Sequence, residues 1–413
     1  MKKSLTLIFS LLLIFCFKAQ ARQLTVGAHG DFQKITAAIS NSKNGDTILV
    51  NPGIYKEGNI IITKKLHLIG KGYPIIDGES KGEIISIKAD SVTFEGFTIQ
   101  HSGYASLQDP AGIKIYDSKY VQIVNNIVND TFFGIYAQYA IGCIIKNNRL
   151  TSHGKLEQEI GNGIHCWKSD SMQITGNTIS GHRDGIYFEF VTNSLIWLNN
   201  SCKNIRYGLH FMFSHNDSYI GNTFSNNGAG VAVMFTHGVR MYNNTFELNW
   251  GDAAYGLLLK EISDSYIQGN HFNRNTTGIY MEGASRIEMT KNIFTNNGWA
   301  MRIQASCMDV KVTHCNFRSN SFDVATNGTL VLNYFSENYW DKYEGYDLNK
   351  DNYGDVAYRP ISMFSMIIET NPQSMILFRS VLISLLDRTE KVVPTLIPEN
   401  LKDDKPLMKP EKL

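Results

Sequence analysis

The sequence predicts an all-β protein built as a right-handed parallel β-helix, a solenoid with coils of about 22 residues. The first observation behind this prediction is a repeat that runs through residues 112–322. Its units are 22, 29, 22, 23, 22, 26, 22 and 22 residues apart and open at Gly112, Gly134, Gly163, Gly185, Gly208, Gly230, Gly256, Gly278 and Ala300. Such a period indicates a solenoid, in which each unit buries its apolar face only against its neighbours.

The second observation is an alternation of apolar residues within each unit. Counting the opening residue as zero, offsets one and three are apolar in almost every unit, as in Ile186 and Phe188. This is the periodicity of a β-strand, and no unit holds ten consecutive residues with a helical stripe. Three short strands and three bends fit into about 22 residues, the length of one coil of a parallel β-helix.

The third observation is an asparagine at offset fourteen. It recurs in eight of the nine units as Asn126, Asn148, Asn177, Asn199, Asn222, Asn244, Asn270 and Asn292. An inward amide at a bend can hydrogen-bond the amides above and below it, which satisfies polar groups that burial would otherwise leave unpaired. We therefore expect an internal asparagine ladder along the solenoid.

Both ends of the solenoid are expected to carry a helix. Residues 31–42 predict a short amphipathic helix with Asp31 as its N-cap, which would cover the open strand edges at the N-terminal end. Residues 375–388 predict a second amphipathic helix, too short to span a bilayer. It has a narrow polar stripe of Ser380, Ser384, Asp387 and Arg388.

Two interpretations of this second helix stay open. It can be a cap that packs on the last coil, or a docking helix for a membrane partner. In the second case the contact residues would be the apolar side chains Leu377, Phe378, Val381, Leu382 and Leu385.

The N-terminal segment has the features of an export signal. Lys2 and Lys3 precede an apolar run from Leu5 to Phe17, and a small-x-small cleavage motif ends at Ala21. The expected organisation is a signal peptide at 1–21, the β-helix at 22–340, a C-terminal loop and amphipathic helix at 341–390, and a tail at 391–413. The tail has no core-forming pattern.

The composition excludes some classes of function. A net charge of +1 leaves no electrostatic footprint for nucleic acid. The exported chain would keep five cysteines, an odd number at no shared spacing, which argues against a full disulfide framework. Cys143 and Cys166 fall at inward offsets and are expected to be core thiols.

Two successive coils carry soft metal ligands at outward positions. If offsets one and three point inward, offset four points outward, so Met212 and Met234 should lie about 4.8 Å apart on the outer face. His210 shares their side of the strand, and His215 and His237 follow at offset seven. Thioether and imidazole ligands suit copper, and Cu(I) in particular, better than calcium or magnesium. The sequence therefore predicts a site that holds copper transiently.

The alternative for these methionines is packing. Methionine is commonly a core residue, and Met241, Met281 and Met289 fall at inward offsets. A slip of one residue in the assumed register would turn Met212 inward as well.

A second class of function is a carbohydrate-active enzyme, such as a lyase, epimerase or hydrolase. An outer-face groove for a polysaccharide would consist of His165, Trp167, Arg183, Asp184, Tyr187 and Glu189. These residues offer an aromatic platform, an acid–base pair and a cation for a uronate. The outward offsets hold no cluster of aspartates to bind calcium or activate water, so we favour a protein that is not an enzyme. A purely structural adhesin would make the histidine and methionine grouping a coincidence.

The most distinctive text lies at residues 163–167, 181–190, 206–215 and 228–234, which read GIHCW, GHRDGIYFEF, RYGLHFMFSH and GAGVAVM. Here the sequence resembles the NosD family, the periplasmic maturation proteins for nitrous oxide reductase. The resemblance extends over the whole exported chain. It includes the stretch LLDR at 385–388 and the ending KPLMKP at 405–410.

This resemblance implies a periplasmic accessory protein without enzymatic turnover. Such a protein works with an ABC transporter made of a permease and an ATPase, and with a copper chaperone. It helps to assemble the copper–sulfide centre of nitrous oxide reductase. The resemblance also implies peripheral membrane association through the permease. It supports copper handling at His210, Met212 and Met234, and it favours the docking interpretation of residues 375–388.

Overall fold

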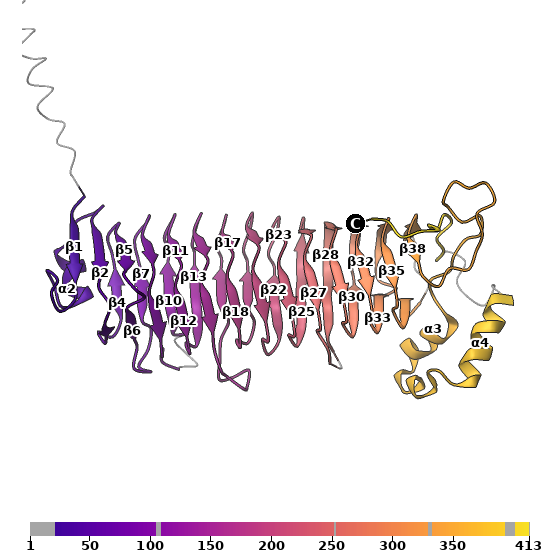
Figure 1. The fold of residues 1–413 in the computed structure, drawn as a ribbon, viewed down its shortest axis with the longest axis horizontal. Helices are drawn as coiled ribbons and strands as arrows, with labels where there is room; N and C mark the ends of the chain where they lie inside the picture. The colour runs from indigo at the N-terminus through magenta and orange to yellow at the C-terminus, as the bar shows by residue number, and fades with distance from the viewer. Residues whose placement is uncertain (1–20, 105–108, 252, 329–332, 393–400, 413) are drawn as a thin grey trace, which may run out of the picture.

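The computed structural model describes residues 21–104, 109–251, 253–328, 333–392 and 401–412. The expected signal peptide lies outside these residues, apart from Ala21. The described chain forms a parallel β-solenoid of about 13 turns, drawn from left to right in Figure 1. This confirms the predicted fold class. Within the described ranges, no helix is both long and apolar enough to cross a membrane.

Successive coils stack their strands in three parallel rows, which belong to sheets of 25 and 13 strands. The first row is β4(Ile60–Ile62), β7(Ile85–Ile87), β10(Ala111–Tyr116), β13(Phe133–Gln138), β16(Ile164–Trp167), β19(Ile186–Glu189), β22(Tyr207–Met212), β25(Ala229–His237), β28(Tyr255–Gln268), β30(Thr277–Glu282), β33(Trp299–Ile303) and β36(Phe322–Ala325). The second row is β1(Gln23–Val26), β2(Thr47–Val50), β5(His67–Gly70), β8(Thr93–Glu95), β11(Gln122–Val124), β14(Ile144–Lys146), β17(Gln173–Thr175), β20(Leu195–Trp197), β23(Ser218–Ile220), β26(Arg240–Tyr242), the second half of β28, β31(Ser285–Thr290), β34(Met308–Thr313) and β37(Tyr334–Ser336). The third row is β3(Ile54–Tyr55), β6(Ile75–Asp77), β9(Thr98–Gln100), β12(Ile127–Asn129), β15(Arg149–Thr151), β18(Thr178–Ser180), β21(Asn200–Cys202), β24(Thr223–Ser225), β27(Thr245–Glu247), β29(His271–Asn273), β32(Ile293–Thr295), β35(Asn316–Arg318) and β38(Tyr339–Trp340).

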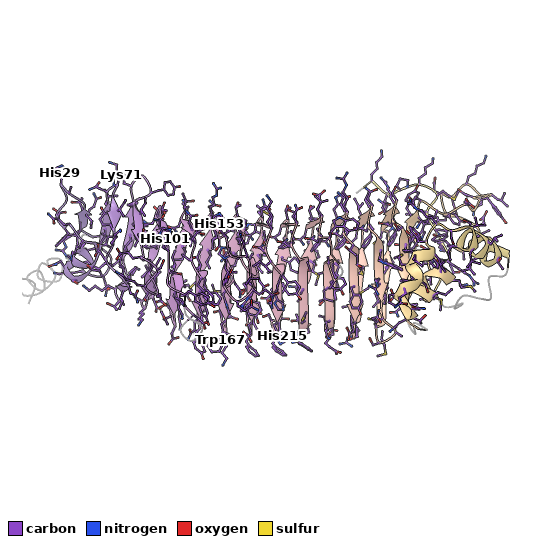
Figure 2. The ribbon with its side chains drawn as sticks, turned by 90° about the horizontal axis from the view of Figure 1, so that it is seen from below. His29, Lys71, His101, His153, Trp167 and His215 are labelled. Atoms are coloured by element: carbon purple, nitrogen blue, oxygen red, sulfur yellow. The ribbon has the colours of Figure 1, made fainter. Side chains whose placement is uncertain are left out.

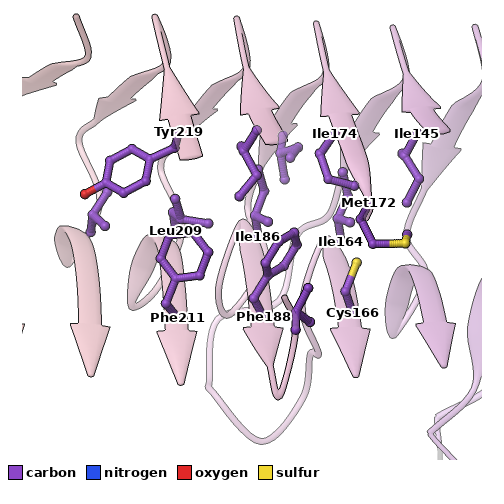
Figure 3. Close-up of a cluster of buried hydrophobic side chains, with 14 of the residues drawn as sticks. Ile145, Ile164, Cys166, Met172, Ile174, Ile186, Phe188, Leu209, Phe211 and Tyr219 are labelled. Carbon is purple, nitrogen blue, oxygen red and sulfur yellow. The ribbon is translucent and has the colours of Figure 1, made fainter. Parts of the chain in front are cut away.

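The interior of the solenoid is a continuous apolar core. Offsets one and three of each coil point inward as the alternation predicts, so Ile186 and Phe188 are fully buried. Figure 3 shows them in the core, one coil after Ile164 and Cys166, which face Ile174. Cys143 and Cys166 are fully buried free thiols, which confirms their prediction as core residues.

The asparagine ladder is confirmed. From Asn148 to Asn292, each side-chain oxygen accepts both the backbone N–H and the side-chain N–H of the previous ladder residue at 2.9–3.1 Å. Cys315 takes the next position, and its N–H donates to Asn338 Oδ1 at 3.0 Å. The inward amides thus satisfy buried backbone donors coil after coil, which is the physical reason for their spacing.

A second ladder at another bend was not expected from the sequence. Its members lie nineteen or twenty residues after the opening residue and are Asn204, Asn227, Asn249, Asn275, Asn297 and Asn320. Each side-chain oxygen accepts the backbone N–H of the previous member at 3.0–3.2 Å. The recurring asparagine was visible in the sequence at this offset. It was not recognised because several asparagines lie at the same bend and only one of them points inward.

His182 occupies the position of this second ladder one coil before Asn204. Its backbone N–H donates to Asn204 Oδ1 at 3.1 Å. The ring is fully buried, and neither ring nitrogen has a hydrogen-bond partner among the described residues. Burial lowers the pKa of His182 from 6.5 to about 4.

This buried imidazole predicts a loss of stability in acid. Between pH 6.5 and about 4 the unfolded chain protonates the His182 ring and the folded chain does not. The free energy of unfolding is therefore unaffected by this group above pH 6.5. It falls by about 3 kcal/mol as the pH falls through this window. His182→Asn removes the titration and supplies a ladder amide, so its stability should depend less on pH. Chemical denaturation at several pH values would test this, and equal pH slopes for the two proteins would contradict it.

The helix at the N-terminal end is shorter than expected. It is α2(Ile35–Asn41), and it packs Ile35, Ala38 and Ile39 on the first coils. The prediction of Asp31 as N-cap is wrong, because the Asp31 carboxylate accepts hydrogen bonds from Thr25 instead. Glu57, from the next coil, caps the helix by accepting the N–H groups of Ile35 at 2.7 Å and Thr36 at 2.9 Å.

The C-terminal region folds as three helices, where one was predicted. They are α3(Met363–Thr370), the 3-10 helix η1(Pro372–Leu377) and α4(Val381–Val392), drawn at the lower right of Figure 1. The predicted helix 375–388 is interrupted at Arg379, whose φ of 64° is left-handed. The side chains of Asp387 and Arg388, expected in the polar stripe, lie outside the described ones.

This helical region is anchored on the last coils. Phe364, Ile368 and Ile383 are buried in a cluster with Trp299 and Phe322. The Arg302 guanidinium donates to the Glu369 carboxylate at 2.6 and 2.9 Å. One face of the helices therefore caps the solenoid, as the cap interpretation predicts.

The end of the tail is also part of the core, contrary to expectation. Leu401 and Asp403 are fully buried. The Asp403 carboxylate accepts the backbone and side-chain N–H groups of Asn338 and the indole N–H of Trp340, each at 3.0 Å. Asp403 thus ends the first asparagine ladder, a contact across more than sixty residues that local pattern does not encode.

Candidate metal centre

The first strand row brings two sets of outward side chains into register. At offset two, His165 pairs with Tyr187, and Tyr187 pairs with His210. At offset four, Trp167, Glu189, Met212 and Met234 stand side by side on β16, β19, β22 and β25. Because adjacent strands of a sheet lie about 4.8 Å apart, residues of one set are direct neighbours.

Met212 and Met234 are register partners on β22 and β25, as the sequence predicts. Both side chains are half-buried and point away from the core, whereas Met241 is fully buried. The Tyr187 hydroxyl donates to Met212 Sδ at 3.7 Å. The register slip that would have turned Met212 inward does not occur.

His210 is more deeply placed than an outer-face position suggests. It is only 6% exposed, and its ring contacts those of Tyr187 and Tyr207 at centroid distances of 4.8 Å. Its Nδ1 lies 3.5 Å from Asp184 Oδ2. Both ring nitrogens are buried and neither has a hydrogen-bond partner among the described residues, so a metal can reach Nε2 only if the covering side chains move.

Asp184 is held rigidly beside His210. It is fully buried and accepts two hydrogen bonds from the Arg206 guanidinium, at 3.0 and 2.7 Å. Burial alone would raise the pKa of Asp184, but the contacts with His210 and Arg206 and the Arg206 charge hold that pKa below its usual value. A carboxylate facing Nδ1 favours a proton there, so that Nε2 carries the lone pair that a metal requires.

His215 and His237 form a separate pair beyond the strand ends. Their rings stack with centroids 4.1 Å apart, and the backbone N–H of His237 donates to His215 Nδ1 at 3.3 Å. Partial burial and the neighbouring His237 lower the pKa of His215, which favours its neutral, metal-binding form. Phe213 and Phe235 stand between this pair and the methionines in sequence.

Two of the residues expected in a polysaccharide groove, His165 and Asp184, are buried. His165 is buried, and burial together with the Arg183 charge lowers its pKa to about 3. Arg183 donates to Asn162 Oδ1 at 3.3 Å. Because Asp184 is occupied by Arg206, it is not free to act as a general acid or base.

Four of the groove residues are half-buried. Arg183 lies at the bend before β19, and the other three are outward strand residues: Trp167, Tyr187 and Glu189. Trp167 lies along the same edge of the solenoid as His215 in Figure 2. Burial and the nearby Glu189 carboxylate raise the pKa of Tyr187, so its hydroxyl stays protonated and acts as a donor. These residues therefore border the methionine pair.

Imidazole, thiol and carboxylate side chains alone do not form a metal site in the part of the chain that the structure describes. There, no three side chains of His, Cys, Asp or Glu converge on one point. Met212 and Met234 lie on the same outer face as His210, and thioether with imidazole is a donor set that fits Cu(I).

Comparison with known families decides the identity of the chain. Residues 147–353 match the family model described as periplasmic copper-binding protein (NosD). The chain belongs to the NosD family. Residues 34–171 match the model of the right-handed β-helix region, in agreement with the fold.

Two curated relatives are similar to this NosD-family chain over most of their length. Both are named probable ABC transporter binding protein NosD. The protein from Pseudomonas aeruginosa is 26% identical over 85% of this chain and 86% of its own. The protein from Stutzerimonas stutzeri is 26% identical over 97% of this chain and 93% of its own.

Solved structures share the fold. A family PL6 alginate lyase in complex with a trisaccharide aligns with a TM-score of 0.59 at 14% identity, over 73% of this chain and 81% of the lyase. An α-1,3-glucanase from Streptomyces thermodiastaticus aligns with a TM-score of 0.56 at 12% identity, over 74% of this chain and 65% of the glucanase. At these identities the likeness concerns the β-helix alone.

Proposed function

We propose that this NosD-family chain holds Cu(I) transiently on its outer face, with Met212, Met234 and His210 as ligands. One observation carries the proposal: two half-buried thioethers are register partners beside the His210 imidazole, and neither nitrogen of this buried ring has a hydrogen-bond partner among the described residues. Copper is cargo here rather than a resident cofactor. His215 and His237 form an adjacent imidazole pair that can take part in loading or release.

The surrounding residues suit exchange of the metal. Neutral thioethers bind Cu(I) without the strong hold of thiolates, so a partner with better ligands can remove it. The Tyr187 hydroxyl donates to Met212 Sδ, and a metal must compete with this hydrogen bond for the sulfur. The Asp184 carboxylate lies 3.5 Å from His210 Nδ1, and its negative charge favours the tautomer that leaves the lone pair on Nε2.

We further propose that the protein acts in the periplasm with an ABC transporter permease and ATPase. In this role it receives copper from a chaperone and assists assembly of the copper–sulfide centre of nitrous oxide reductase. The description of the family as periplasmic and copper-binding supports this proposal, as does the naming of both relatives as ABC transporter binding proteins. Because Asp184 is paired with Arg206, this carboxylate is a poor candidate for the catalytic acid of a carbohydrate-active enzyme. The ion pair therefore favours a protein without turnover of its own.

The metal function is tested by titrating the purified exported chain with Cu(I) under anaerobic, reducing conditions. A chromogenic Cu(I) chelator serves as competitor. We expect the protein to withdraw Cu(I) from a weak chelator and to lose it again to a strong one. A protein that withdraws none from either chelator would contradict the proposal.

The C-terminal helices are the proposed docking face for the permease. Four of the five predicted contact residues are exposed: Leu377 by 40%, Val381 by 78%, Leu382 by 58% and Leu385 by 56%. Phe378 instead packs on Phe322, with ring centroids 5.3 Å apart. Ile376, which was not predicted, is 89% exposed. One face of the helices thus caps the solenoid and the other presents apolar side chains to a partner.

We expect Leu382→Gln with Leu385→Gln to abolish co-purification with the transporter complex. The change removes two exposed apolar anchors and leaves the buried Phe364–Ile383 cluster intact. The matched control is Leu198→Gln, because Leu198 is 65% exposed on the solenoid, far from the helices. Equal recovery of the transporter with all three proteins would exclude this face as the docking site.

A further inference from the structure

An open pocket lies where the last described residues of the chain cross the third strand row. It has a volume of about 540 Å³ and is lined by Ile293, Asn316 and Arg318 of the solenoid and by residues 409–412. These four residues belong to a segment, 401–412, that we call the strap. The strap returns along the last coils, at the upper right of Figure 1. Two segments that are distant in the sequence therefore form the pocket.

The strap is fixed on the solenoid by hydrogen bonds at successive points. The Asp403 carboxylate holds the amide of Asn338, and the Leu407 N–H donates to Asn338 O at 2.9 Å. Further along, the buried Asn316 side chain donates through Nδ2 to Glu411 O at 2.9 Å, and the Glu411 N–H donates to Asn316 Oδ1 at 3.1 Å. Because the backbone is held on both sides of residues 409 and 410, this wall of the pocket has a defined position.

Three cations line the pocket without a partner: Arg318, Lys409 and Lys412. Among the described residues, none of them has a carboxylate oxygen within 4.0 Å of its charged group. The Arg318 guanidinium lies over the Tyr339 ring, 5.7 Å from the ring centroid, which restricts its orientation. Like charges that converge on one pocket repel each other, so folding alone does not account for this grouping.

The nearby carboxylates are engaged elsewhere. Glu411 also lines the pocket, but its Oε1 lies 3.1 Å from His314 Nδ1. Asp341 stands on the next coil beside Arg318, and its carboxylate accepts the backbone N–H of Ser319. The pocket therefore concentrates positive charge, although the net charge of the whole chain is only +1.

We infer that this pocket binds a phosphate ester. A phosphate group presents three acceptor oxygens and up to two negative charges, which suits one guanidinium fork and two ammonium groups. The pocket falls in the range of roughly 300–1,000 Å³ that is usual for small-molecule sites, and it is larger than a bare phosphate requires. Ile293 and Pro410 supply an apolar wall for the organic substituent of the ester. A lipid headgroup and a soluble phosphate monoester share this chemistry.

The inference is independent of the copper proposal, because no residue of the pocket belongs to the first strand row. Its test is calorimetric titration of the purified exported chain with butyl phosphate. Arg318→Gln with Lys409→Gln removes two of the three charge-assisted contacts and should raise the dissociation constant by roughly tenfold or more. The matched control is Arg149→Gln with Lys146→Gln, because these residues are an arginine and a lysine exposed elsewhere on the solenoid. The control should bind as the wild type does.

Inorganic phosphate should bind more weakly than butyl phosphate, because it leaves the apolar wall uncovered. A wild type that does not bind butyl phosphate, or equal binding by the double variant and the control, would overturn the site. Inorganic phosphate that binds as tightly as the ester would overturn the assignment of an ester. If thermal denaturation shows that the double variant is unfolded, Lys412→Gln replaces it. This variant removes one cation and should also weaken binding.

Vesicles distinguish the two sources of the ester. Co-sedimentation with vesicles of phosphatidylglycerol and phosphatidylcholine in equal parts is measured for wild type, double variant and control. Vesicle binding that only the double variant loses would assign the pocket to a lipid headgroup. Equal vesicle binding by the three proteins, together with butyl phosphate binding at the pocket, would assign it to a soluble ester. The C-terminal helices are the same in all three proteins, so their own contribution to vesicle binding cancels.

Discussion

Replacement of Met212 and Met234 together by leucine is expected to lower the affinity for Cu(I) by roughly 100-fold or more, since loss of even outer-shell support costs 10–100-fold. The double variant loses both thioethers and keeps only imidazole ligands. Its stability should change little, because leucine conserves volume and apolar character and both side chains are half-buried outside the core. Competition with a chromogenic Cu(I) chelator measures the affinity, and thermal denaturation measures the stability.

The matched control for this experiment is Met241→Leu. Met241 is fully buried, pairs with Tyr219 on the second strand row and faces the core. It should leave the Cu(I) affinity unchanged. Cells that make the double variant should also yield nitrous oxide reductase without its full copper content. Equal Cu(I) affinities in wild type, double variant and control would remove these methionines from the site.

The sequence predicted the solenoid because each coil repeats the same pattern of apolar residues and bends. Alternating residues determine which side chains point inward, and the coil length determines which residues stack. The register of Met212 on Met234 follows from these two facts alone. The offset-fourteen asparagines were recognisable because a buried amide with a stacking partner is needed at every coil, not at one.

Contacts between distant segments were not predictable in this way. Glu57 caps α2 in place of Asp31, and Asp403 ends the asparagine ladder. The sequence around neither residue predicts these contacts. The burial of His210 depends on Tyr187 and Tyr207 beside it and on the Arg206–Asp184 pair from the neighbouring coil. Periodicity gives the direction of a side chain, but only tertiary packing determines how far it is covered.

Asn222→Leu is expected to lower the free energy of unfolding by about 3–6 kcal/mol, because several buried donors lose their acceptor at once. The Asn222 side-chain oxygen accepts the backbone and side-chain N–H groups of Asn199 at 2.9 and 3.0 Å. Its side-chain nitrogen donates to Ile196 O and Asn244 Oδ1, both at 3.0 Å. Leucine can replace none of these four bonds in the interior.

Asn200→Leu is the control for the ladder, because Asn200 follows Asn199 directly but is exposed on β21. It should unfold at nearly the same denaturant concentration as the wild type, whereas Asn222→Leu unfolds much earlier. A second test combines Asn199→Leu with Asn222→Leu. Asn222→Leu leaves the Asn199 amide without its ladder acceptor, and the double variant no longer contains that amide. The double variant should therefore lose less stability than the sum of the losses measured for Asn199→Leu and Asn222→Leu. Strict additivity, or a wild-type midpoint for Asn222→Leu, would show that the ladder does not stabilise the solenoid.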